Sequence, residues 1–199
     1  MSRLSDRTSR RVPLVLAAAL TALALAGCGA SRGSTAAVVG DRQISISDLQ
    51  QATRDIQGAL GADASITQAD VLYYMILAPY TIDAAAKRGL GVSANDVRLW
   101  EQQATGSTNP SQVPEFSSAG VETMRGALSL QKLGSLPAAD FQQAYDQLRA
   151  DLVAAGVHVN PRYGAFDLKQ FDAKQVAIVQ VTPNWILQTA TPSPSPSAS

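Results

Sequence analysis

Residues 71–82 read VLYYMILAPYTI, twelve consecutive positions without a charged side chain. This run lies inside a longer segment that carries the signals of a single helix. Thr67 and Asp70 have the spacing of a capping box at its start, and a basic pair before Gly89 is typical of its end. A helix that is apolar on all sides is either buried on several sides or keeps one face for a partner. The stretch therefore predicts the helix around which the fold is organised.

Two uses of this helix remain open from the sequence. In the first it is a central core helix. In the second it contributes a partly exposed peptide-binding groove, because methionine is flexible and tyrosine combines a large apolar ring with a hydroxyl. Pro79 should also remove one helical hydrogen bond and bend the helix near Met75. The candidate peptide-binding residues are Tyr73, Tyr74, Met75, Leu77 and Tyr80.

On the N-terminal side, the sequence predicts a short hairpin followed by a helix. Residues 36–44 read as a strand, a turn and a returning strand. Ser47, with Gln50 three positions later, predicts a capped helix that runs to about Leu60 and is closed by Gly61.

On the C-terminal side, Ser93 and Asp96 predict the capped start of a helix over 93–103. A second helix is predicted over 121–133, after a loop at 105–120. The clearest helical periodicity follows, with apolar residues spaced 4-3-4-3 at Phe141, Tyr145, Leu148, Leu152 and Ala155. Residues 157–159 and 176–181 then predict two strands. The expected fold is α+β, mainly helical, with a small sheet that joins strands from both ends of the chain.

The order of these elements resembles the N-terminal chaperone module of the SurA/PrsA type of extracytoplasmic foldases. The residues that carry the resemblance are AVVGD at 37–41, ISISDL at 44–49, AAKRGLGVS at 85–93 and VNPRYGAFD at 159–167. It covers most of residues 36–187. It implies a helical chaperone module closed by N-terminal and C-terminal strands.

The chain departs from this family where many members carry a parvulin prolyl isomerase domain. Only residues 105–137 are available in that place, and they contain no histidine. The single histidine, His158, is predicted on the solvated face of a strand. The GASRG stretch at 29–33 fits the nucleophile-elbow pattern but lacks the strand and helix that the motif needs. Asp167 and Asp172 lack the dense ligand spacing of a calcium loop. We therefore predict no catalytic, metal or cofactor site.

The N-terminus predicts export and lipidation. Basic residues at 3–11 and an apolar run at 12–26 precede Cys28, the only cysteine, in the three-part layout of a secretory signal. The sequence LAGC at 25–28 resembles the bacterial lipobox. This resemblance implies that the Cys28 thiol takes a diacylglyceryl group and becomes the new N-terminus. A lipid with more than one chain gives durable anchoring.

These signals divide the chain into four parts. They are a lipoprotein signal peptide at 1–27, a flexible tether at 28–35, the helical module at 36–188 and a disordered Pro/Ser tail at 189–199. The expected location is the extracytoplasmic face of the cell membrane in a Gram-positive-type bacterium.

Charge and composition narrow the function further. Beyond residue 27 the chain holds 12 Lys and Arg against 15 Asp and Glu, which offers no basic footprint for nucleic acid. The expected partners are the membrane, through the lipid, and unfolded or extended exported polypeptides. The predicted function is a non-catalytic, chaperone-like binding module. The alternatives are a lipoprotein dedicated to one protein partner and a residual peptidyl-prolyl isomerase.

Overall fold

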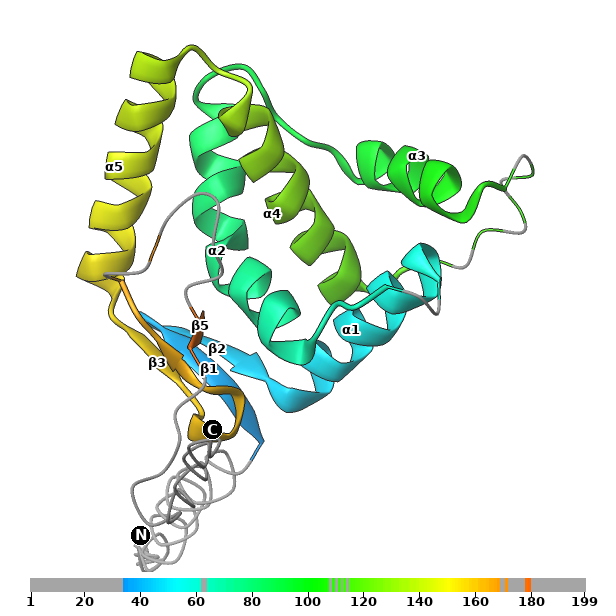
Figure 1. The fold of residues 1–199 in the computed structure, drawn as a ribbon, viewed down its shortest axis with the longest axis horizontal. Coiled ribbons are helices and arrows are strands. Elements are labelled where there is room, and N and C mark those ends of the chain that lie inside the picture. Colours follow the sequence, from blue (N-terminus) through cyan, green and yellow to red (C-terminus); the bar gives the residue numbers. More distant parts are fainter. Residues whose placement is uncertain are drawn as a thin grey trace, which may run out of the picture. The chain divides into compact units, whose positions relative to one another are not determined.

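The computed structural model describes residues 34–168, with gaps at 62–63, 108, 110, 112 and 114, together with residues 171, 178 and 179. The described residues from Ala36 onward belong to one compact unit. The predicted signal peptide, the lipidation site at Cys28, the Pro/Ser tail and most of the predicted 176–181 strand lie outside the described residues. The described part is α+β and mainly helical, as predicted (Figure 1).

The elements follow one another in a simple order. The strands are β1 (Thr35–Val39), β2 (Arg42–Ser45), β3 (Val157–Val159), β4 (Ala165–Phe166) and β5 (Ile178–Val179). The α-helices are α1 (Ile46–Leu60), α2 (Gln68–Ala86), α3 (Ala94–Thr105), α4 (Ser118–Gly134) and α5 (Ala138–Ala155). A short 3₁₀ helix, η2 (Pro161–Tyr163), links β3 to β4.

Side-chain caps start helices α1 to α4, and two of the three predicted caps are correct. Capping boxes are present at Thr67 for α2 and at Ser93 for α3. The predicted cap at Ser47 is wrong, because α1 starts two residues earlier. The Ser45 hydroxyl accepts the Asp48 N–H at 2.9 Å, and Ser45 has the extended backbone of a residue that also ends β2. The pair Ser45 and Asp48 has the spacing of a capping box with an acidic third residue, which the helix N-terminus favours.

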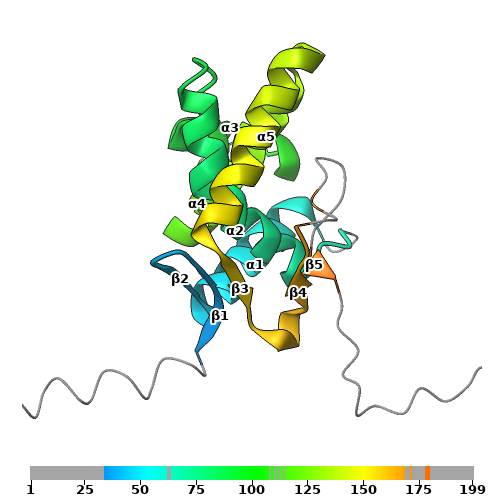
Figure 2. The same cartoon turned by 90° about the vertical axis from the view of Figure 1, so that its left-hand side faces the viewer.

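The main sheet joins the two ends of the described chain, as predicted. The strand order is β2-β1-β3, and β3 pairs antiparallel with β1 so that Val38 lies opposite His158. The His158 side chain is exposed, in agreement with the prediction. Strand β5 does not enter this sheet. It pairs with β4 in a separate two-stranded sheet (Figure 2).

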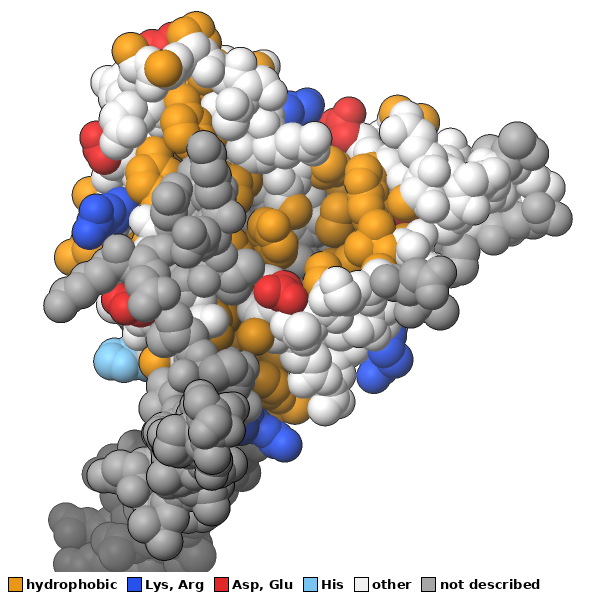
Figure 3. All heavy atoms as spheres, in the orientation of Figure 1, with side chains coloured by type: hydrophobic (Ala, Val, Ile, Leu, Met, Phe, Trp, Pro, Cys, Tyr) orange, Lys and Arg blue, Asp and Glu red, His pale blue; other side chains and the backbone are white. Residues whose placement is uncertain are grey.

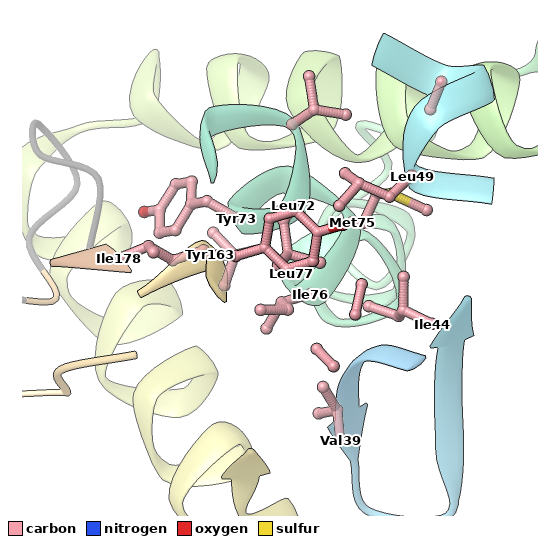
Figure 4. Close-up of a cluster of buried hydrophobic side chains, with 14 of the residues drawn as sticks. Val39, Ile44, Leu49, Leu72, Tyr73, Met75, Ile76, Leu77, Tyr163 and Ile178 are labelled. Atoms are coloured by element: carbon pink, nitrogen blue, oxygen red, sulfur yellow. The ribbon is translucent and has the colours of Figure 1, made fainter. Parts of the chain in front are cut away.

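Helix α2 is the centre of the core, which confirms the first interpretation of the 71–82 run. Val71, Leu72, Ile76 and Ala78 have no exposed surface. The helix packs most extensively against α4 and also contacts α1 and α5 (Figure 1). The close-up of the core shows side chains from α2 between the β1–β2 hairpin on one side and Tyr163 and Ile178 on the other (Figure 4).

Helices α2 and α4 approach each other at backbone distance. A Cβ atom placed on Gly126 would lie 2.5 Å from the Ala78 Cα and 2.6 Å from the Ala78 Cβ. The buried Thr81 hydroxyl donates a hydrogen bond to the Gly126 carbonyl at 3.0 Å, across the same contact. The absence of a side chain at Gly126 therefore sets how closely the two central helices pack.

Helix α2 continues through Pro79 to Ala86, although proline has no N–H to donate to the Met75 carbonyl. The Arg42 guanidinium replaces this donor, with its Nη1 atom 2.8 Å from the Met75 oxygen. Arg42 also lies 3.7 Å from a Glu122 carboxylate oxygen on α4. One side chain from β2 thus supplies the hydrogen bond that proline removes from the central helix.

Candidate functional site

The structure separates the five candidate peptide-binding residues on α2 into two groups. Tyr73, Met75 and Leu77 are 3, 4 and 1% exposed, so their side chains belong to the core. Tyr74 and Tyr80 are partly buried and keep some surface exposed to solvent. A polypeptide-binding role for this helix stays a prediction. In the conformation described here, Tyr74 and Tyr80 are the two members of the set that a partner can reach.

Tyr74 belongs to a continuous set of six rings, which we call the aromatic cluster. Helix α2 provides two of its members, helix α5 provides two, and the remaining two come from the segment that follows η2. The members are Tyr73, Tyr74, Phe141, Tyr145, Phe166 and Phe171. The cluster therefore joins three stretches of chain that are far apart in the sequence.

The geometry of the cluster places Phe171 between the two helices. Its ring stacks on Tyr145 of α5, with the centroids 4.9 Å apart and the planes 8° apart. The Phe171 centroid also lies 6.4 Å from that of Tyr73 of α2. Tyr73 in turn meets the edge of Tyr74 at 5.3 Å. Offset-stacked and edge-to-face contacts of this kind stabilise beyond simple area burial, by about 0.5–1.5 kcal/mol per pair.

A hydrogen bond from a side chain to the backbone accompanies these ring contacts. The Tyr145 hydroxyl donates to the Phe171 carbonyl. Phe171 and Ile178, the latter in β5, are only 4 and 8% exposed. The site thus holds a short piece of chain by two kinds of interaction, apolar contact with side chains and a polar contact with the backbone.

Of the six members of the aromatic cluster, only Tyr73 and Tyr74 were among the candidate residues that the sequence predicted. Phe141 and Tyr145 were recognised as the apolar face of α5, but nothing in their spacing connects them with α2. Phe166 and Phe171 follow the last helix in a segment with no clear periodicity. Only the 4-3-4-3 pattern of α5 offered a signal, and it indicates burial without identifying the partner.

A cavity of about 250 Å³ lies between α1, α3 and the chain just before α4, apart from the aromatic cluster. The Glu101 carboxylate lines it and is only 2% exposed. Removal from water raises the pKa of Glu101 above its ordinary value of 4.5, and the ion pair with Arg98, at 3.3 Å, opposes this shift. Val113 and Phe116 provide apolar walls. The polar part of the lining includes Arg54, Asp55 and Glu115.

The Glu101 side chain should make stability depend on pH. A carboxyl group whose pKa is raised in the folded state binds a proton more readily when folded. Its stabilising contribution is fully present below pH 4.5, its ordinary pKa, and is lost as the pH rises through the folded-state value. We therefore expect Glu101→Gln to raise the free energy of unfolding near neutral pH, with a difference from wild type that shrinks toward about pH 4.

Urea unfolding followed by circular dichroism at several pH values measures this difference. Glu122→Gln is the control, because the Glu122 side chain is 51% exposed. A Glu101→Gln difference that is the same at every pH would contradict the assignment.

Other classes of site receive no support from the described residues. Within residues 34–168, apart from the gaps already given, no group of three or more His, Cys, Asp or Glu side chains is arranged to hold a metal ion. Asp172 and the 29–33 stretch lie outside the described part. Among the helices that the structure describes, none has both the length and the apolarity that a membrane crossing requires.

Comparison with protein-family models, with curated proteins and with solved structures found no match to this chain. The site must therefore be interpreted from its own geometry.

Proposed function

We propose that this protein is a lipid-anchored, extracytoplasmic, chaperone-like module that binds unfolded or extended segments of exported polypeptides without turnover. The observation that carries the proposal is the way the aromatic cluster holds Phe171. Rings from α2 and α5 contact its side chain, and the Tyr145 hydroxyl binds its backbone carbonyl. Every residue of an unfolded chain offers a backbone carbonyl. This combination therefore suits clients that share apolar character but no common sequence.

The strength of such contacts fits reversible binding. Burying one large apolar side chain stabilises a complex by about 1.5–3 kcal/mol, and ring pairs add about 0.5–1.5 kcal/mol each. A few contacts of this size, less the entropy of ordering the client, give weak and short-lived association. Weak association over many apolar segments is what a holding chaperone requires.

Exposed apolar surface also supports the proposal. On the face drawn in Figure 3, hydrophobic side chains gather along α5 and between α4 and α3. Val153 lies on α5, the helix that carries Phe141 and Tyr145, and is 58% exposed, and Leu99 of α3 is 48% exposed. Exposed apolar surface adds to the area that a client segment can cover.

The structural role of residues 105–137 supports the proposed non-catalytic function. In the resembling foldases an isomerase domain occupies this place. Here the segment supplies α4, the main packing partner of the central helix. The lipobox at Cys28 supports the proposed tether and cell-surface location. On this proposal, the chain keeps a binding scaffold of the SurA/PrsA type and binds clients with it, without an isomerase domain.

The proposal is tested with a chain that begins at Gly29, which retains the whole compact unit from Ala36 onward. We expect it to suppress the aggregation of several unrelated unfolded proteins, measured by light scattering, and to leave the isomerisation rate of a prolyl test peptide unchanged. Suppression of none of these proteins would reject the general chaperone role and favour a single dedicated partner. Acceleration of the prolyl peptide would favour the isomerase alternative.

A point variant connects the activity with the site. We expect Tyr74→Ala to weaken binding of a fluorescent unfolded client by about fivefold, because it removes a partly exposed ring of the aromatic cluster. Leu60→Ala is the matched control, since Leu60 is a 43% exposed apolar residue at the end of α1. Equal losses in the two variants would mean that binding does not depend on the aromatic cluster.

A further inference from the structure

We propose that clients bind between α2 and α5 and along the edge of β4, and that the chain's own C-terminal segment already occupies this site. The segment is held there at Phe171, Ile178 and Val179, and it acts as an internal ligand that clients displace. The identity of the client rests on the function proposed above. The occupancy itself rests on contacts that the structure describes. The partner that fits the site is an extended polypeptide segment with an aromatic residue followed by β-branched aliphatic residues.

The first argument comes from how Phe171 is held. The 4.9 Å stacking on Tyr145 and the contact with Tyr73 require an aromatic ring but no other feature of residue 171. The hydrogen bond from Tyr145 is to the backbone carbonyl, which any residue provides. Another extended chain that places a ring between α2 and α5 can make the same contacts. The site therefore selects aromatic residues in general.

The second argument comes from the pairing of β5. It adds to β4 as an antiparallel strand, with Ala165 opposite Val179 and Phe166 opposite Ile178. Addition of an extended peptide to a strand edge is a recurrent mode of peptide recognition. The pair is a separate two-stranded sheet outside the β2-β1-β3 sheet. Strands β4 and β5 are two residues long each, so their pairing adds few backbone hydrogen bonds and can be exchanged for that of a client strand.

The third argument comes from composition. Residues 176–181 read VAIVQV, with β-branched residues at four of six positions. Such a run is rich in the residues that favour strands. Any unfolded chain exposes its apolar runs to water until folding buries them, so segments of this kind are available as clients. The internal ligand thus defines the client class by its own sequence.

The test measures competition between the internal segment and a probe. The probe is a labelled synthetic peptide of residues 169–181, KQFDAKQVAIVQV, added to the chain that begins at Gly29. We expect Phe171→Ala in the protein to bind this probe about tenfold more tightly than wild type, because the binding-competent state is more populated. Leu60→Ala in the protein is the control and should bind as wild type does, because Leu60 is a 43% exposed residue at the end of α1. A probe peptide with alanine at position 171 should bind neither protein.

A disulfide between β4 and β5 tests the reverse change, because it locks the internal segment in place instead of loosening it. Ala165 and Val179 are register partners across β4 and β5, and antiparallel partners lie at Cα separations that a disulfide spans. The variant Ala165→Cys with Val179→Cys should lose probe binding when oxidised and regain it when reduced. This comparison uses one protein in both states, so it remains decisive if Phe171→Ala proves too unstable to measure.

The outcomes separate this inference from the proposed function. Equal probe binding by wild type and Phe171→Ala, or by the oxidised and reduced disulfide variant, would overturn the internal-ligand inference. Probe binding that responds as expected, in a protein that does not suppress aggregation of unfolded clients, would uphold the internal ligand and reject the chaperone role. A stable dimer formed by Phe171→Ala would show that the segment exchanges between copies, and would overturn displacement by clients.

Discussion

Replacement of Gly126 by alanine is expected to lower the free energy of unfolding by about 3 kcal/mol, because the added methyl group has no space. A Cβ at this position would lie 2.5 Å from the Ala78 Cα, a distance that non-bonded carbon atoms do not reach. The neighbour is backbone, so no side-chain rotation relieves the overlap. Helices α2 and α4 must move apart, and this separation weakens the hydrogen bond from Thr81 to the Gly126 carbonyl.

The matched control for this change is Gly58→Ala. Gly58 lies inside α1, and a Cβ there would meet no atom within 4 Å. Alanine at an unhindered helical position is favoured over glycine by about 0.5–1 kcal/mol, so this variant should be more stable than wild type. Both values come from urea unfolding monitored by circular dichroism. A Gly126→Ala protein as stable as wild type would mean that α2 and α4 do not pack at backbone distance.

Replacement of Arg42 by methionine is expected to lower the free energy of unfolding by about 2 kcal/mol. The change removes a charged donor from the Met75 carbonyl, which Pro79 already leaves without its helical partner. The ion pair of Arg42 with Glu122 should contribute little, since the side chains are 36 and 51% exposed and the atoms are 3.7 Å apart. Glu122→Gln, which removes the ion pair alone, should therefore change stability by less than about 0.5 kcal/mol.

A double-mutant cycle identifies the Met75 carbonyl as the origin of this loss. In a Pro79→Ala background, the new N–H at position 79 can donate to the Met75 carbonyl along the helix. Arg42→Met should then lower stability by about 1 kcal/mol less than it does in the wild-type protein, which is a coupling of the size seen between contacting residues. Strict additivity of the two changes would show that Arg42 acts through another contact.

Local features of the fold were predictable because their signals are local. The capping boxes at Thr67 and Ser93 depend on side chains three residues apart, and both are present. The wrong start of α1 has an equally local cause. Ser45 and Ser47 both precede possible partners at the right spacing, and the end of β2 gives Ser45 the extended backbone that a cap requires.

The candidate site was only partly predictable. The apolar run of α2 identified the central helix and included Tyr73 and Tyr74. It did not distinguish the ring that is buried from the ring that keeps contact with solvent. Phe171 was not predicted, since its partners Tyr73 and Tyr145 are 98 and 26 residues away in the sequence. No spacing rule connects positions at such separations.

The sequence by itself determined the five helices, the apolar character of the helix that contains residues 71–82, and the meeting of the strands at 36–40 and 157–159. Hydrophobic periodicity and helix caps depend on residues that are close together in the sequence, so both can be recognised without the structure. Only the tertiary structure decided that Gly126 meets Ala78, that Arg42 replaces the donor missing at Pro79, and that Phe171 lies between α2 and α5. Each of these contacts depends on where separate elements come to lie, and that arrangement is set by packing of the whole core.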